Sequence, residues 1–499
     1  MCAAKSVAVV GGGWAGCAAA VELARAGHKV TLFESARTLG GRARAVSVHG
    51  VQVDNGQHIM LAAYAETLRL LALVGIDRQR AFLTLPLQMI YPSSTQGMLF
   101  AAPRLPAPLH LAGALLRAKG LAWADKMALA RFSTTARWMG WTLYNDCSVA
   151  ELLERFDQTP RLVQLMWRPL CLAALNTPPE RASAKVFLAV LRDSLGAPKR
   201  AASDMLLPRT DMSTLFPQAA ARYIEEHGGS VRTGAKAARL ARFRGQWQVE
   251  ASGAAVGGNW TAYFDGVVLA CPASAAAALL EPLALPAPSE GQPISAAAVA
   301  GAWSAAHDLA SRHEEPPETA RAVVAPEVDE NADTLSAVIA QLQSLEHEPI
   351  TTIYLQYDAA LRLDLPFYAL VDNPVTGHWG QFVFDRGHLE PGHAGLLSVV
   401  ISASGQASAL DQDVLAMTVA AQLSAAFGRR ELASPAWTRV ITEKRATFAC
   451  TPGLQRPSHA TGRPGLVLAG DYTDGDYPAT LESAVRSGVS AARQFGSAA

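Results

Sequence analysis

Three glycines and one carboxylate near the start of the chain have the types and spacing that bind a dinucleotide. The glycines are Gly11, Gly13 and Gly16 in the segment 11–16 (GGGWAG), and the carboxylate is Glu34. Glycine permits a tight turn at 11, close approach of backbone N–H groups to a pyrophosphate at 13, and close helix packing at 16. Glu34 can accept hydrogen bonds from both ribose hydroxyls and would repel a 2′-phosphate.

The elements around this loop must position it, because a lone glycine motif can also be a structural turn. The apolar run 6–10 predicts a buried strand directly before the loop, and residues 15–26 predict a helix that ends at Gly27. Residues 29–33 predict a second strand, so that Glu34 lies at its carboxyl end. This order of strand, loop, helix and strand favours a dinucleotide site over a turn.

The stretch after Glu34 distinguishes one dinucleotide from another. Residues 39–44 (LGGRAR) offer flexible backbone and two guanidiniums, Arg42 and Arg44, where a diphosphate needs donors; a solvated basic loop is the alternative. A hairpin then leads into residues 54–58 (DNGQH). The whole run resembles the GG-x-R and D-x-G-x-H signatures of the flavin amine oxidase and carotenoid desaturase superfamily. This resemblance implies FAD rather than NAD.

A second glycine motif lies near the other end of the chain. Residues 465–469 predict a strand, Gly470 and Asp471 a turn at its carboxyl end, and residues 479–495 a helix. Asp471 can bond a flavin ribityl or phosphate group. The N-terminus of the closing helix, around Thr480 and Leu481, can direct N–H groups and positive dipole at the flavin ring. Since this segment holds no cysteine, we expect non-covalent FAD.

The superfamily resemblance completes the predicted cofactor site. It implies that the short strand within residues 228–237 meets the adenine through backbone groups near Ala237. The predicted cofactor-binding residues are Gly11, Gly13, Trp14, Ala15, Gly16, Glu34, Gly41, Arg42, Arg44, Asn55, Gly56, Gln57, His58, Ala237, Gly470, Asp471, Thr480 and Leu481.

Composition excludes some classes of function. Lys plus Arg equals Asp plus Glu at 43 each among 499 residues, so no global field recruits nucleic acid. Only 17% of residues are charged, which favours an apolar ligand or a membrane surface. Six scattered cysteines without C-x-x-C predict reduced thiols of a cytoplasmic protein, and no metal site is predicted. We expect neither a signal peptide before the first strand nor a transmembrane helix.

The order of these segments predicts an α/β protein with two interleaved domains. A Rossmann-like FAD-binding domain is assigned to residues 1–75, 228–281 and 440–499. An interleaved substrate domain of mixed sheet and helices is assigned to 76–227 and 346–439. Residues 282–345, rich in Ala, Pro and Glu, predict a surface insertion that is mobile or partly helical.

Residues 104–141 combine positive charge with apolar side chains. They carry six Lys or Arg against one acid, Asp125, interleaved with leucines and tryptophans. Such a pattern suits helices that dip into an anionic leaflet, and it equally suits an amphipathic hairpin packed on its own domain. The first alternative would make the protein peripheral on the inner face of the cell membrane.

Three middle segments narrow the resemblance. Residues 54–64, 167–179 and 207–213 resemble the squalene-associated FAD-dependent desaturase group. The activity named for that group, hydroxysqualene dehydroxylation, implies that an allylic C–OH of hydroxysqualene becomes C–H, with hydride from reduced FAD, in squalene and hopanoid biosynthesis. A carotenoid-type desaturase is the alternative enzyme. An amine oxidase and a non-catalytic prenyl-binding protein on the same scaffold are weaker alternatives.

Loss of hydroxide from such a substrate needs an acid within hydrogen-bond reach in an apolar tunnel. The candidate donors are His58, Asp211 and Tyr477. His58 is equally a structural histidine near the flavin, and Asp211 is equally the N-cap of a helix that begins at Met212. The candidate tunnel walls are Trp167, Leu170, Phe187, Phe382 and Phe384.

Overall fold

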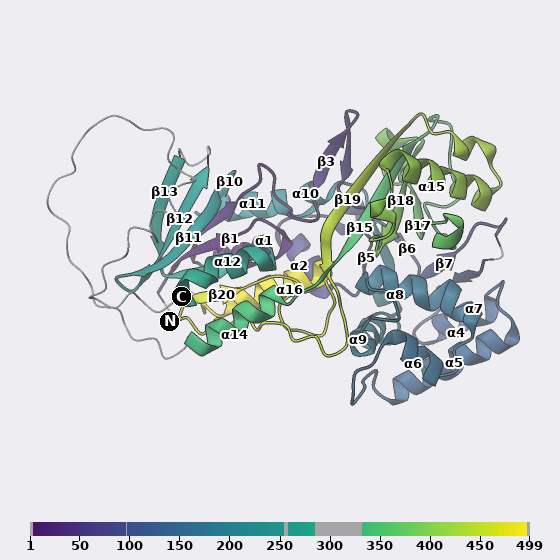
Figure 1. Cartoon of the computed structure of the whole chain (residues 1–499), viewed down its shortest axis with the longest axis horizontal. Coiled ribbons are helices and arrows are strands. Elements are labelled where there is room, and N and C mark those ends of the chain that lie inside the picture. The colour runs from purple at the N-terminus through teal and green to yellow at the C-terminus, as the bar shows by residue number, and fades with distance from the viewer. Residues whose placement is uncertain (1–2, 96, 254–257, 285–331, 497–499) are drawn as a thin grey trace.

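Five parallel strands form the sheet that positions the glycine loop. The computed structural model describes residues 3–95, 97–253, 258–284 and 332–496. The strand order β10-β2-β1-β14-β20 joins Ser230–Thr233, Lys29–Glu34, Ser6–Val10, Gly266–Leu269 and Leu466–Leu468. All four pairs are parallel. Segments from the start, middle and end of the chain therefore build one Rossmann-like sheet, as predicted, and Figure 1 shows both termini beside it.

Helices and a small antiparallel sheet cover the two faces of this parallel sheet. On one face pack α1 (Trp14–Arg25), α11 (Pro217–Glu226) and α16 (Leu481–Arg493). The antiparallel strands are β11 (Lys236–Phe243), β12 (Gln246–Gly253) and β13 (Gly258–Phe264). Phe33 of β2 contacts Trp260 and Phe264 of β13, with ring centroids 5.3 and 6.2 Å apart. Both faces are thus buried, as a parallel sheet requires.

A second sheet forms the centre of the other half of the molecule. Its antiparallel order β16-β17-β18-β15-β19 joins Phe367–Ala369, Phe382–Asp385, Leu396–Ser402, His347–Gln356 and Trp437–Phe448. Helix α15 (Gln412–Phe427) packs on it through Leu415, Val419 and Leu423. Because β19 pairs with β15 along its length, residues 440–448 lie in this sheet and not in the parallel sheet. The predicted boundary at 440 therefore falls within a strand.

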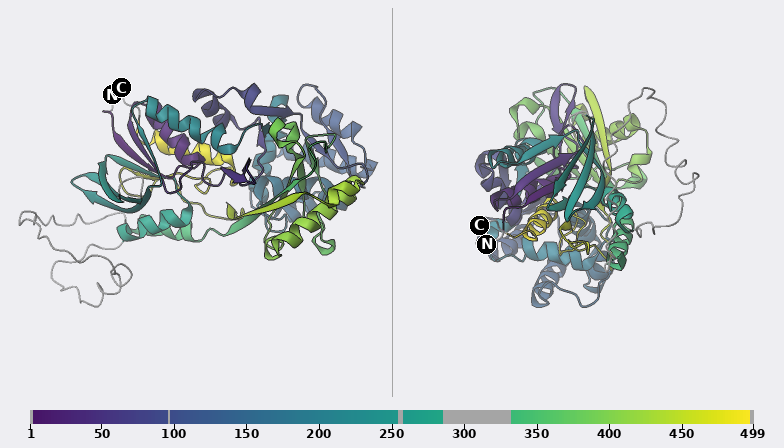
Figure 2. Two further views of the ribbon diagram at one scale, coloured as in Figure 1. Left: turned by 90° about the horizontal axis from the view of Figure 1, so that it is seen from above. Right: turned by 90° about the vertical axis from the view of Figure 1, so that its left-hand side faces the viewer.

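A helical block completes this half. Its helices are α4 (Leu109–Arg117), α5 (Trp123–Trp138), α6 (Val149–Arg155), α7 (Pro160–Leu162), α8 (Arg168–Leu175) and α9 (Ala184–Ser194), with a π-helix over Val163–Trp167. Figure 2 shows the block (blue) at the end of the long axis opposite the chain termini. Strand β9 (Met205–Pro208) is fully buried and pairs between β5 (Met60–Leu61) and β6 (Phe82–Leu85).

Further α-helices and strands complete the described part of the fold. They are β3 (Ala45–Val48), β4 (Val51–Asp54), α2 (Ala65–Leu73), α3 (Arg78–Ala81), β7 (Gln88–Ile90), β8 (Leu99–Ala101), α10 (Met212–Leu215), α12 (Ala273–Ala284) and α14 (Ala332–Gln343). Most of the predicted insertion, residues 285–331, lies outside the described residues. Its last part does not fit a surface insertion, because α14 packs on α12 and buries Leu335 and Leu342.

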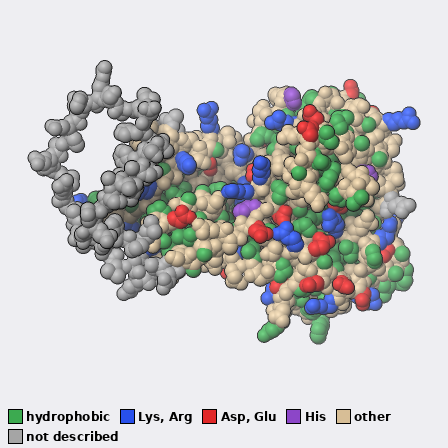
Figure 3. All heavy atoms as spheres, viewed as in Figure 1, with side chains coloured by type: hydrophobic (Ala, Val, Ile, Leu, Met, Phe, Trp, Pro, Cys, Tyr) green, Lys and Arg blue, Asp and Glu red, His purple; other side chains and the backbone are tan. Residues whose placement is uncertain are grey.

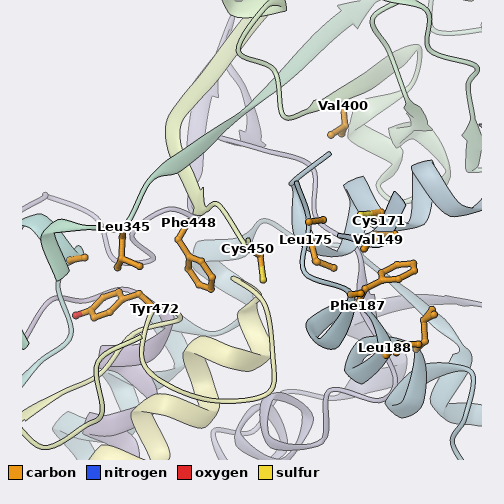
Figure 4. Packing of buried hydrophobic residues seen from close by; sticks show 14 of the residues in the cluster. Val149, Cys171, Leu175, Phe187, Leu188, Leu345, Val400, Phe448, Cys450 and Tyr472 are labelled. Carbon is orange, nitrogen blue, oxygen red and sulfur yellow. The ribbon is translucent and has the colours of Figure 1, made fainter. Parts of the chain in front are cut away.

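One hydrophobic core joins the two halves. Buried residues of the helical block, among them Phe187, belong to the same cluster as Val10 and Phe33 of the parallel sheet. Figure 4 shows how the cluster continues between the halves: Phe448 and Tyr472 lie beside the closing helix, and Leu175 and Phe187 lie in the helical block. The relative position of the two halves is therefore fixed by packed side chains.

Candidate functional site

The predicted cofactor residues converge on one cavity of about 530 Å³ at the carboxyl ends of β1 and β2. Every one of them lines this cavity except Gly16 and Ala237. Ala237 lies on β11, which has already left the cavity: the preceding amides of Gly234 and Ala235 donate to Ala36 O and Glu34 O. The cavity wall beside Glu34 is instead formed by Ser35, Ala36, Thr38, Cys271 and Pro272.

Backbone packing explains two of the glycines in the loop. Gly11 has φ +111°, and a Cβ there would lie 2.5 Å from the carbonyl oxygen of Ala270. A Cβ on Gly16 would lie 1.8 Å from the carbonyl oxygen of Gly11. No side chain fits at either position. Gly16 thus lets α1 approach the loop, and Gly11 keeps the loop against β14, so that the helix N-terminus faces the cavity.

Glu34 is held firmly at the end of β2. Its Oε2 accepts from the Gly12 N–H at 2.7 Å, and its Oε1 accepts from the Ala36 N–H at 2.7 Å. The side chain is buried at the cavity wall. Oε1 also accepts from the Ser35 hydroxyl at 3.2 Å. Because a carboxylate oxygen accepts about two hydrogen bonds, Oε2 is the oxygen that keeps room for a ribose hydroxyl.

An ion pair joins the two ends of the chain within the cavity wall. Arg42 Nη2 lies 2.5 Å from Asp471 Oδ1, and Arg42 Nη1 donates to Ala446 O at 2.7 Å. Burial would lower the pKa of Arg42, but Asp471 outweighs it and raises the pKa. The carboxylate of Asp471 is therefore already paired with Arg42. Arg44 Nη1 donates to Gly41 O at 2.7 Å, which leaves most of the Arg44 donors for a phosphate.

Asn55 fastens the arginine loop to the hairpin that follows it. Its Oδ1 accepts from the Arg44 N–H at 3.1 Å and its Nδ2 donates to Arg42 O at 2.9 Å. The preceding carboxyl, Asp54, is buried and accepts from the Met212 N–H at 2.7 Å. Burial raises the pKa of Asp54 to about 7. Asp54 does not line the cavity and acts as a loop-fixing group.

His58 offers an unused nitrogen at the cavity. Its Nε2 is buried and has no hydrogen-bond partner among the described residues. Burial lowers the pKa of His58 to about 4, so the ring is neutral near pH 7. A neutral imidazole is a weak acid, which argues against His58 as the proton donor. An unpaired buried nitrogen in a cavity wall does fit contact with a bound cofactor.

The cavity as a whole fits a dinucleotide. It combines a loop whose Cβ positions are blocked by backbone, an acceptor at the end of β2, and the orphaned nitrogen of His58. The N-termini of α1 and α16 both border it through Trp14, Ala15, Thr480 and Leu481. Thr480 caps α16 by accepting from the Ser483 N–H at 3.2 Å. Two helix N-termini give the cavity a positive potential suited to phosphate and to an anionic ring.

A second cavity of about 590 Å³ meets the first and is lined mainly by apolar side chains. Four of the predicted tunnel residues, Trp167, Leu170, Phe187 and Phe382, line it, whereas Phe384 lines the cofactor cavity only. The residues common to both cavities are Ile59, Tyr64, Ala173, Ala174, Phe382 and Thr480. An apolar ligand in the second cavity can therefore contact a cofactor in the first.

A tyrosine and an aspartate form a polar pair in the wall of this apolar cavity. Tyr477 Oη donates to Asp193 Oδ2 at 2.6 Å, and Arg192 Nε lies 2.7 Å from Asp193 Oδ1. Burial would raise the pKa of Asp193, but its hydrogen bonds from Arg192 and Tyr477 outweigh burial and lower it. Burial, with the bond to Asp193, raises the pKa of Tyr477. The pair is thus a phenol held by a carboxylate.

Arg486 completes this group, because its guanidinium lies 4.3 Å from the centre of the Tyr477 ring. Asp193 could not be predicted from local spacing. It is the last residue but one of α9, next to Arg192, and meets Tyr477 only through the fold.

The catalytic interpretation of Asp211 is not supported. It is the N-cap of α10, where its Oδ1 accepts from the Thr214 N–H at 2.9 Å. It lines neither cavity. The structure supports the alternative role of Asp211 as a helix N-cap.

The described residues contain neither a metal-binding cluster nor a membrane-spanning helix. In that part of the chain, no group of three His, Cys, Asp or Glu could hold a metal ion. No helix there is both long and apolar enough to cross a bilayer.

Known proteins are similar in sequence to this chain over nearly its whole length. Hydroxysqualene dehydroxylases of Rhodopseudomonas palustris and Sinorhizobium fredii are 28% and 27% identical, each alignment covering 98% of this chain and 97% of the relative. A zeta-carotene desaturase of Synechocystis is 22% identical over 98% of this chain and 96% of its own.

Solved structures agree on the fold. Cyclohexylamine oxidase from Brevibacterium oxydans has a TM-score of 0.59 and 15% identity over 99% of this chain and 98% of its own. The flavin-containing amine oxidoreductase family matches residues 14–302 and 310–495. The chain therefore belongs to the flavin-containing amine oxidoreductase family and is an FAD-dependent oxidoreductase.

Proposed function

We propose that this enzyme reduces hydroxysqualene to squalene with loss of water. The observation that carries the proposal is the apolar cavity that meets the cofactor cavity and contains the Tyr477–Asp193 pair. An apolar wall suits a polyprenyl chain, and a protonated phenol in that wall suits one departing oxygen. The names of the Rhodopseudomonas and Sinorhizobium relatives support the same reaction.

In this proposal the residues around the first cavity bind FAD without a covalent bond. Glu34 accepts from the ribose, Arg44 and the N-terminus of α1 bind the diphosphate, and Asp471 fixes the cofactor through Arg42. Thr480 and Leu481 present the N-terminus of α16 to the ring. His58 contacts the cofactor through its free nitrogen. Reduced FAD bound there supplies the hydride.

The chain's own groups then have to remove the hydroxide. The C–O bond of the substrate breaks, the carbon accepts the hydride, and the oxygen leaves as water after gaining one proton. We assign that proton to Tyr477, since hydroxide is a far stronger base than a tyrosinate. Rotation about the Cζ–O bond turns the proton from Asp193 toward the departing oxygen.

Neighbouring charges support this transfer. Asp193 holds the phenol in place, and its negative charge favours the allylic cation as it forms. Arg486 over the Tyr477 ring favours the tyrosinate that remains until solvent returns the proton. The surrounding aliphatic and aromatic walls exclude the water that would otherwise capture the cation.

Anaerobic incubation of the reduced enzyme with hydroxysqualene tests the proposal. Squalene should form while the oxidised flavin spectrum returns. If hydroxysqualene is recovered unchanged, the proposal is contradicted.

A carotenoid-type desaturase is the second candidate, and the Synechocystis relative favours it. It would use the same apolar cavity with oxidised FAD. Conversion of phytoene or zeta-carotene by the oxidised enzyme, with no reaction of hydroxysqualene, would replace the first proposal by this one.

We also propose where the enzyme acts. Hydroxysqualene partitions into lipid, so a peripheral position on the cytoplasmic face of the cell membrane would bring substrate and enzyme together in squalene and hopanoid biosynthesis. Vesicle binding tests this position separately from the chemistry.

A further inference from the structure

We propose that helices α4 and α5 dock on an anionic lipid bilayer and that the apolar cavity opens into the bilayer between them. The α4–α5 surface is defined as the exposed side chains of residues 104–141. The inference rests on the proposed function in one respect, because it supplies a route for a lipid-soluble substrate. Its tests measure lipid binding and lipid transfer, so they stand apart from turnover.

Large apolar side chains are unusually exposed on this surface. The exposed fractions are 86% for Trp138, 70% for Trp123, 69% for Leu116 and 56% for Leu109. Isolated exposed hydrophobic residues are common, but several on two neighbouring helices mark an interaction site. Figure 3 shows hydrophobic side chains projecting from the lower edge of the right-hand half, where Figure 1 places α5 and α6.

The helical repeat places the exposed apolar side chains of α5 on one side of that helix. At 100° per residue, Trp123, Met127 and Trp138 fall within about 60° of one another. The opposite side carries Leu129 and Phe132, which are buried in the core. Helix α5 is therefore apolar on two sides, and the internal core accounts for only one of them.

The charges on the surface suit anionic headgroups. The exposed side chains include Arg104, Arg117, Lys119, Arg131 and Arg137. The acid of this segment, Asp125, is buried, where it accepts from the Ala122 N–H at 2.8 Å and from the Thr159 hydroxyl at 2.6 Å. Tryptophan and leucine flanked by cations is the composition of an interfacial helix.

The same helices form the mouth of the apolar cavity. Most of its lining residues are buried or half-buried. The exposed ones are Pro108, Leu109, Ala112, Thr134, Arg137 and Ala173. All but Ala173 belong to α4, to α5 or to the residue before α4, and Ala173 borders the cofactor cavity at the inner end. The opening thus lies between α4 and α5, beside the exposed tryptophans.

Co-sedimentation of the full-length, FAD-loaded protein with vesicles tests the docking. Vesicles that contain phosphatidylglycerol should bind the protein, phosphatidylcholine alone should bind it weakly, and salt should weaken the binding. The double variant Trp123→Ser, Trp138→Ser should lower binding about tenfold or more. Both side chains are outside the cavity walls, so the flavin spectrum should not change.

A matched control uses exposed aromatic residues of the other half. Phe243 and Tyr263 are 43% and 45% exposed on β11 and β13. The double variant Phe243→Ser, Tyr263→Ser should bind vesicles as the wild type does. Equal binding by the Trp123/Trp138 variant and the wild type, or equal binding to neutral and anionic vesicles, would overturn the docking surface.

Transfer of a fluorescent polyene, cis-parinaric acid, from vesicles tests the opening. Energy transfer from Trp141 and Trp167, which line the cavity, reports arrival of the probe. Ala112→Phe should slow loading about tenfold because it fills the mouth, whereas Ala124→Phe, exposed on α5 outside the cavity wall, should not. Equal loading rates in both variants would overturn the proposed opening, even if the enzyme proved inactive on hydroxysqualene.

Discussion

The cofactor cavity and the apolar cavity meet in the same protein but are built in different ways. The cofactor cavity is defined by backbone: blocked Cβ positions at Gly11 and Gly16, helix N-termini, and a carboxylate fixed by two N–H groups. The apolar cavity is defined by side chains from many separate elements, joined to one Tyr477–Asp193 pair. We therefore expect substitutions at the backbone positions of the cofactor cavity to disturb its structure. In the apolar cavity, we expect the reaction to depend on the few polar atoms of the Tyr477–Asp193 pair.

The largest expected effect tests the backbone part of this comparison. In Gly16→Ala the new Cβ would overlap the carbonyl oxygen of Gly11, so α1 and the loop must separate. We expect loss of bound FAD and destabilisation of about 3 kcal/mol or more. Bound flavin per protein and thermal unfolding measure both. Gly405→Ala is the matched control, because a Cβ there meets nothing within 4 Å; equal behaviour of the two variants would contradict the backbone account.

The second effect tests the side-chain part. Tyr477→Phe removes the proposed proton donor and keeps the ring that stacks with Arg486. We expect kcat for hydroxysqualene reduction to fall about 100-fold or more, with full FAD occupancy and little change in stability. Single-turnover kinetics on the reduced enzyme measure the chemical step. Wild-type turnover by this variant would exclude Tyr477 as the donor.

A smaller effect is expected at Glu34. Glu34→Gln keeps one acceptor oxygen and replaces the other by an NH2 group, which cannot accept from the N–H of Gly12 or Ala36, and it removes the negative charge. The affinity for FAD should fall about tenfold, which corresponds to about 1.4 kcal/mol. Fluorescence titration of the apoprotein with FAD measures the change, and kcat at saturating FAD should be retained. Unchanged affinity would show that Glu34 serves the loop alone.

The smallest effect concerns pH and Asp54. Because burial raises the pKa of Asp54 to about 7, the folded protein holds a proton there that the unfolded chain releases near pH 4. The stability associated with this proton is complete below pH 4 and is lost as the pH rises through 7. Asp54→Asn can still accept from the Met212 N–H and has no such loss. Its melting temperature, relative to the wild type, should rise by a few degrees between about pH 5 and pH 8; a constant difference would contradict the assignment.

The comparison also explains what the sequence could predict. Gly11, Glu34 and Asp471 were identifiable because backbone requirements act over short stretches and leave a fixed spacing. Asp193 could not be predicted, because the Tyr477–Asp193 hydrogen bond joins two distant elements and leaves no spacing in either. Asp211, the other predicted acid, is the N-cap of α10 and lines neither cavity. Ala237 lies on β11 and does not line the cavity, so its backbone contact with adenine stays a prediction.

Domain boundaries were harder to predict for a related reason. Strand β19 runs without a break from Trp437 to Phe448, so no turn marks the predicted domain boundary at residue 440. Helix α14 looked like part of a surface segment because its partner α12 precedes the long Ala- and Pro-rich stretch. Both features depend on contacts between segments that are distant in sequence.

The most direct test of the central claim is the stoichiometry of one anaerobic turnover. The reduced, FAD-loaded enzyme is mixed with excess hydroxysqualene, and squalene is quantified against the oxidised flavin that appears. The account predicts one squalene per flavin oxidised, at a rate that Tyr477→Phe lowers and Glu34→Gln at saturating FAD does not. Oxidation of the flavin without squalene, or no oxidation at all, would contradict it.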